Sequence, residues 1–167
     1  MSISSAIASW NGKSADDIAA IYNQYYNKSD FHSSIVSLIK NKSYETGASW
    51  LLKHDFELGG QLNANEISIV YGVLSKLEYW EAKLHLLQCI EYMPISKTDV
   101  KKVENFLRLT LSGENKFVRT WAYNGFYLLA KQYIEYQEDA NQFFEMALRD
   151  EAPSVKARIR NILKVGF

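Results

Sequence analysis

A helical pattern that returns at regular intervals constrains this chain more than any other feature. In the stretch 116–130, KFVRTWAYNGFYLLA, four apolar side chains (Val118, Ala122, Phe126 and Leu129) fall at positions i, i+4, i+8 and i+11. This spacing places them on one face of an amphipathic helix. The small residues Ala122 and Gly125 allow another helix to approach that face closely.

The same pattern occurs before and after this stretch. The pair Val118–Arg119 aligns with Ala-Lys at 82–83, about 36 residues earlier, and with Val-Lys at 155–156, about 37 residues later. A weaker copy lies at 48–52. A second amphipathic segment precedes each of the three stronger copies, at 67–77, 100–111 and 140–148. A repeated helix–turn–helix unit of this length is typical of stacked helical repeats.

The periodicity and the turn residues predict nine helices and no strand. Ser14, Asp30, Asn63 and Thr98 are the predicted N-caps, and Pro94 is expected to close a helix. The predicted organisation is a flexible leader over 1–14 and a single repeat domain over 15–167. The expected helices span 15–26, 31–40, 44–57, 64–77, 80–93, 99–111, 116–132, 138–149 and 153–165.

The segment FVRTWAYNGFYLLA resembles the second helix of a HEAT-like or armadillo-like repeat, in which a small residue or Val is followed by Arg and then by Ala and Leu at helical spacing. The resemblance extends over about residues 30–167. It implies an all-α, right-handed α-α superhelix of about four helix pairs plus an N-terminal helix. The second helices would line the concave side. The family consists mainly of scaffolds, and no family functional residue is carried over.

Composition narrows the class of partner. Of the 167 residues, 47% are apolar, which favours a packed domain over a disordered chain. The formal net charge is zero, so nucleic acid is a disfavoured partner and a protein is the expected one. No apolar run reaches the length of a membrane span. We therefore expect a cytoplasmic protein without a membrane or cofactor, either a monomer or a homodimer.

The candidate binding surface follows from the repeat alignment. Equivalent positions on the second helices carry cations (Lys83, Arg119 and Lys156), and a second equivalent set carries His85, Trp121 and Arg158. Trp and Arg are frequent anchors of protein interfaces. Structural roles, such as ion pairs with the next repeat or packing of the indole, explain the same residues. The full set of candidate binding residues is Lys83, His85, Arg119, Trp121, Tyr123, Lys156, Arg158 and Arg160.

Two other functions compete with a non-enzymatic scaffold. The basic and aromatic groove is also suited to nucleic acid, as in helical-repeat DNA-repair proteins. The pair His54-Asp55, with His32 upstream and Asp99 or Asp139 downstream, superficially resembles the metal site of a His-Asp phosphohydrolase. A two-residue motif occurs often by chance, so we expect no catalytic residue and no metal site, and a scaffold that binds a macromolecule on its concave face.

Overall fold

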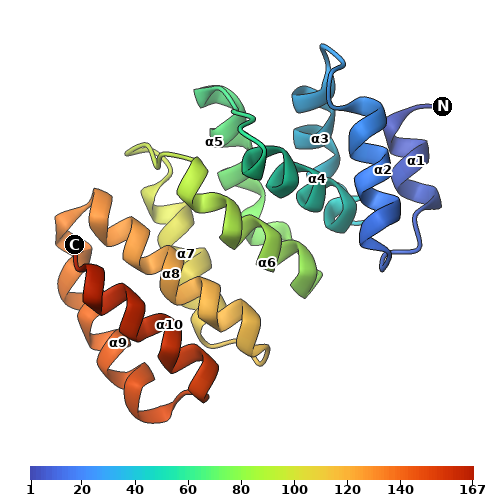
Figure 1. Ribbon diagram of the computed structural model, residues 1–167. Helices are drawn as coiled ribbons and strands as arrows, with labels where there is room; N and C mark the ends of the chain where they lie inside the picture. Colours follow the sequence, from blue (N-terminus) through green and yellow to red (C-terminus); the bar gives the residue numbers. More distant parts are fainter. The chain divides into compact units, whose positions relative to one another are not determined.

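The computed structural model describes residues 1–167, and it is entirely helical (Figure 1). It contains ten α-helices, three short 3₁₀ turns and no strand, so the predicted all-α class is confirmed. The nine predicted helices are all present, and one helix near the N-terminus was not predicted. The helices are α1 Ile3–Ser9, α2 Ala15–Tyr25, α3 Phe31–Ile39, α4 Glu45–Glu57, α5 Ala64–Val73, α6 Trp80–Cys89, α7 Val100–Leu111, α8 Lys116–Gln132, α9 Gln137–Asp150 and α10 Pro153–Val165.

The chain divides into two compact units, 1–93 and 94–167, and the boundary falls at Pro94. In the first unit, α4 packs against both α2 and α6, while α3 packs against α4 and α5. Helices α2, α4 and α6 thus form one row, with α3 and α5 behind it. Their core includes Ile18, Ile35, Leu51 and Leu86, all fully buried.

The second unit repeats this arrangement with four helices. Helix α8 packs against α7, α9 and α10, and α10 also packs against α9. Helices α8 and α10 run side by side in the same direction (Figure 1). The predicted apolar face of α8 is the buried one, because Val118, Ala122, Phe126 and Leu129 are each at most 4% exposed. The opposite side of α8 is therefore left for solvent or a partner.

Local capping signals explain where several helices begin. The Ser14 side chain accepts a hydrogen bond from the Asp17 backbone N–H, and Asn63 forms a complete capping box with Glu66. Both predicted caps are confirmed. Asp30 occupies its predicted position without a side-chain capping bond. The prediction at Thr98 was wrong by one residue, because Asp99 is the N-cap of α7.

The unpredicted helix α1 lies within the segment expected to be a flexible leader. Its Ala6 and Ile7 are buried, and Ser2 caps it by accepting from the Ser5 N–H. Gly47 of α4 allows this close approach, since a Cβ at Gly47 would lie 2.6 Å from Ile7 Cγ2. The sequence did not show α1, because seven residues are too few to display a clear helical period.

The long-range side-chain hydrogen bonds fall within a narrow range of sequence separations. Most side-chain hydrogen bonds between distant residues join positions separated by 31 residues, as in Arg108–Asp139, to 39 residues, as in Tyr127–Gly166. Three shorter links span 22 to 24 residues. The larger separations include the predicted spacing of about 36 to 37 residues.

Candidate interaction surface

The surface of α8 and α10 is positioned by the two apolar stripes beneath it. Asn115 starts α8 by accepting hydrogen bonds from the Phe117 and Val118 N–H groups. Pro153 occupies the first turn of α10, where its missing N–H is not needed. Because Val155, Ile159 and Ile162 of α10 face the core, the polar positions between them point away from it.

Arg119, a predicted binding residue, is held by protein acceptors. Its Nε and Nη2 donate to the Glu151 carboxylate at 2.8 Å (Nε–Oε2) and 3.0 Å (Nη2–Oε1). Its Nη1 donates to the carbonyl oxygens of Gly113 and Glu114. Arg119 therefore ties the turn before α8 to the turn before α10, which is a structural role. We call this set of contacts the Arg119 clamp.

Arg158 is in a different situation from Arg119. Its guanidinium lies over the indole ring of Trp121, with Cζ 4.6 Å from the ring centroid. This is a cation–π contact between α10 and α8, worth about 0.5–2 kcal/mol depending on desolvation. Arg158 belongs to none of the ion pairs of the chain. The structure thus joins two of the predicted residues and leaves the charge of one without a carboxylate partner.

The charged residues of α8 and α10 are all positive. Helix α8 contains three cations and α10 contains four, and neither helix contains an acid. Only Arg119 is neutralised by a carboxylate. Lys156 and Arg158 are half-buried, whereas the other unpaired cations are exposed; the unpaired set is Lys116, Lys131, Lys156, Arg158, Arg160 and Lys164. Phe117 adds an exposed aromatic ring, 56% accessible, beside Lys116. We call these residues, together with Trp121, the α8/α10 surface, although they do not all share one face: Lys156 and Arg160 are each two positions from Arg158 and therefore lie on another side of α10.

Tyr123 does not lie on this surface as the sequence predicted. Its side chain is 8% exposed and faces the Arg119 clamp. Burial, followed by the negative charge of Glu151, raises the pKa of Tyr123 to about 12. The pattern was misread because Tyr123 is only one residue beyond the apolar stripe, where it lies beside Arg119, Asp150 and Glu151.

The two predicted residues of the first unit have separate surroundings. His85 Nδ1 lies 2.9 Å from Ser49 Oγ, which links α6 to α4. Burial, and then the positive charge of Lys53, lowers the pKa of His85 to about 4, so its ring is neutral at pH 7. Lys83 is half-buried on α6. Since Lys83 belongs to the first unit and Arg119 and Lys156 to the second, the predicted cation ladder stays a prediction.

The His-Asp motif takes a form that differs from a metal site. The buried Asp55 carboxylate accepts from the Tyr22 hydroxyl at 2.9 Å and contacts His32 Nε2 at 2.7 Å. His54 instead stacks on Trp50, with ring centroids 4.6 Å apart. No group of three or more His, Cys, Asp or Glu side chains is arranged to hold a metal ion. The pair His32–Asp55 thus joins α3 to α4, and the geometry lends no support to the phosphohydrolase alternative.

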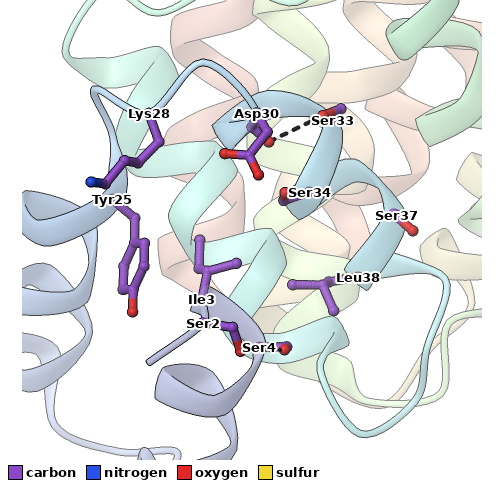
Figure 2. Close-up of a pocket in the computed structure, with 10 residues that line it drawn as sticks. All are labelled: Ser2, Ile3, Ser4, Tyr25, Lys28, Asp30, Ser33, Ser34, Ser37 and Leu38. Atoms are coloured by element: carbon purple, nitrogen blue, oxygen red, sulfur yellow. Dashed lines mark hydrogen bonds between the residues drawn. The ribbon is translucent and has the colours of Figure 1, made fainter.

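A pocket in the first unit, lined by several serines and by apolar side chains, was not predicted from the sequence. It has a volume of about 640 Å³ and lies between the start of α1 and the outer side of α3 (Figure 2). Five serine hydroxyl groups and the Lys28 and Asp30 side chains contribute to its walls, with Ile3 and Leu38 at its base. Ser33 in this wall already donates to the Asp30 carbonyl. The five serines come from two separate segments and form no sequence motif, so the pocket could not be predicted from the sequence.

Four exposed residues of the α8/α10 surface were not predicted as binding residues. Lys116, Phe117, Lys131 and Lys164 were not among its candidate residues, although they are exposed. The sequence does indicate two positively charged helices, because neither 116–132 nor 153–165 contains an acidic residue. The net charge of the whole chain does not reveal this local positive charge, because acids on other segments, such as α9, balance these cations.

Comparison with protein families, characterised proteins and solved structures finds no match to this chain. None of its helices combines the length and the hydrophobicity that crossing a membrane requires.

Proposed function

We propose that this chain is a non-enzymatic, HEAT-like helical-repeat scaffold that binds another macromolecule, a protein in the first instance, along its second helices. The observation that carries the proposal is the α8/α10 surface. There, unpaired cations lie beside exposed or half-exposed aromatic rings on two adjacent helices. Interfaces are enriched in this combination of Arg and aromatic side chains.

The repeat architecture gives further support. Helices of the same row pack side by side within each unit, and the long-range hydrogen bonds follow the repeat spacing. In a stack of this kind, each helix pair contacts only its neighbours and the second helices present a continuous surface. A right-handed superhelix over residues 15–167 is the arrangement we propose for the whole chain.

The polar residues available for catalysis weaken an enzymatic alternative. Burial raises the pKa of the Cys89 thiol, and Cys89 is fully buried, which makes a nucleophilic thiolate unfavourable. The His32–Asp55 pair is not accompanied by a serine or cysteine within its hydrogen-bond network. These contacts are those of a structural network.

Affinity capture tests the proposal. The full-length protein, immobilised, is incubated with an extract of the cells that produce it, and retained proteins are purified and rebound individually. A triple charge reversal, Lys131→Glu/Arg158→Glu/Arg160→Glu, is the test variant, and Lys97→Glu is the control because Lys97 is exposed in the same unit without an ion pair. We expect a retained partner to rebind wild type and the control but not the triple variant. Rebinding that is equal for all three would refute a role for this surface.

A further inference from the structure

We propose that the pocket between α1 and α3, which we call the α1/α3 pocket, binds a neutral sugar, either a monosaccharide or a disaccharide (Figure 2). Its volume of about 640 Å³ lies within the range of about 300–1,000 Å³ that is usual for small-molecule sites. All of its lining residues belong to the first unit. The site therefore does not depend on the α8/α10 surface, on which the proposed scaffold function rests.

The α1/α3 pocket contains polar groups that have no partner in the protein. Asp30 is the N-cap residue of α3, yet its side chain makes no capping hydrogen bond. Neither the Asp30 carboxylate nor the Lys28 ammonium belongs to an ion pair of the chain. The hydroxyls of Ser34 and Ser37 form no hydrogen bond with another protein group. Ser33 donates to the Asp30 carbonyl and can still accept. The pocket thus offers a ligand both donors and acceptors.

The charges around the pocket favour a neutral ligand. Lys28 and Asp30 contribute one charge of each sign, so an anion would be repelled by Asp30 and a cation by Lys28. A sugar hydroxyl both donates and accepts, as a serine hydroxyl does. It can therefore donate to the Asp30 carboxylate and accept from Lys28 or a serine. Hydrogen bonds to the two charged groups would be the stronger ones.

The apolar side chains of the pocket match the other part of a sugar. Ile3 and Leu38 are half-buried at its base, and the ring of Tyr25 forms part of its wall (Figure 2). A sugar ring has C–H groups on its faces and hydroxyl groups around its edge. Contact between the C–H groups and these side chains removes apolar surface from water, which favours binding. A small inorganic ion would make no such contact.

The wall that α1 contributes is held in place without a ligand. The Tyr25 hydroxyl donates to the Met1 carbonyl at 2.6 Å, Ser2 caps α1, and Ile7 packs on α4 at Gly47. A preformed pocket loses little conformational freedom on binding. Each new hydrogen bond replaces one to water, however, so its net gain is modest. We therefore expect a dissociation constant of about 1 mM.

Saturation-transfer difference NMR with the full-length protein tests the inference. The sugars are glucose, galactose, mannose, maltose and lactose, which differ in the orientation of their hydroxyls and in size. The comparison ligands are succinate as an anion, choline as a cation and alanine as a zwitterion. We expect at least one sugar to give a signal that saturates with a dissociation constant of about 1 mM. The comparison ligands should bind more weakly than that sugar.

Variants locate the site. Ser34→Leu places a bulky side chain in the pocket and should abolish the sugar signal. Asp30→Ala should weaken binding about tenfold, and it should leave α3 intact because Asp30 makes no capping bond. The matched controls are Ser154→Leu and Asp16→Ala, which change exposed residues outside the pocket and should bind as wild type. Circular dichroism checks that each variant is folded.

Three results would overturn the inference. They are the absence of a signal with every sugar, a signal that is as strong in both Ser34→Leu and Asp30→Ala as in wild type, and tighter binding of a comparison ligand than of any sugar. None of these results bears on the scaffold function, which the capture experiment tests with variants of α8 and α10.

Discussion

At the scale of single residues, the buried Asp55 shows how a polar group is accommodated in the first unit. Its side chain is 5% exposed and is satisfied by Tyr22 and His32. Burial and the neighbouring Asp55 carboxylate raise the pKa of Tyr22, so its hydroxyl stays a donor. Leaving such a carboxylate without partners would cost far more than the net gain from forming its hydrogen bonds.

Gly60 is the residue on which this network depends. An added Cβ at Gly60 would overlap the Asp55 carboxylate, so Gly60→Ala should displace that carboxylate and break its bonds to Tyr22 and His32. We expect a loss of about 1–3 kcal/mol in the free energy of unfolding, measured by urea denaturation.

Gly72→Ala is the matched control for this substitution. Gly72 lies in α5, and a Cβ there would meet nothing within 4 Å. Because Ala is the better helix former, Gly72→Ala should stabilise the protein by up to about 1 kcal/mol. Equal effects of the two substitutions would show that the Asp55 network contributes nothing specific.

At the scale of elements, α1 and the Arg119 clamp illustrate two ways of joining helices. The clamp uses directed hydrogen bonds from one guanidinium to two turns. Helix α1 is held by close packing, because the Ile7 side chain contacts the backbone of α4 at Gly47. A contact of the second kind is sensitive to the addition of a single methyl group, since packed interiors contain little free volume.

Gly47→Ala should therefore detach α1 while the other helices remain. The new Cβ would lie 2.6 Å from Ile7 Cγ2, and overpacking of this kind typically costs about 1–3 kcal/mol. We expect faster amide hydrogen exchange in residues 3–9. The double variant Gly47→Ala/Ile7→Ala removes the clash and should regain part of the protection. If exchange in α1 is as slow in Gly47→Ala as in wild type, the proposed packing role of Gly47 is wrong.

At the scale of the whole molecule, the chain has no net charge, but its positive and negative residues are distributed unevenly among the helices. The cations of α8 and α10 are offset by acids elsewhere, notably on α9. The two compact units each contain their own core and their own long-range hydrogen bonds. In the helical-repeat architecture proposed above, the stability of the chain would be approximately a sum of unit stabilities and nearest-neighbour terms.

Local perturbations should therefore stay within their own unit. Gly60→Ala should accelerate native-state hydrogen exchange mainly in residues 1–93, and Arg119→Ala mainly in residues 94–167, because each removes contacts that lie within one unit. Mass spectrometry of exchanged peptides resolves the two ranges. A uniform acceleration over both ranges in either variant would mean that the chain opens as one cooperative block.

The all-α class, nine of the ten helices and the buried stripe of α8 could all be predicted from the sequence. These features are local: they depend on helical period and on caps such as Ser14 and Asn63, which a linear pattern records. The sequence also identified Trp121 and Arg158 as candidates, since their positions follow from the repeat. The prediction failed for α1, which is too short to show a period, and for Tyr123, which a neighbouring helix buries.

Which polar side chains already have partners could not be predicted, because it depends on how the helices pack. Arg119 and Arg158 were both predicted as binding residues, yet Arg119 is engaged by Glu151 and two carbonyl groups, while Arg158 lies over Trp121 without an acidic partner. His32 and Asp55 meet, but His54 turns to Trp50. These outcomes depend on which side chains from distant segments arrive at the same place, and hydrogen bonds and ion pairs act over only a few ångströms.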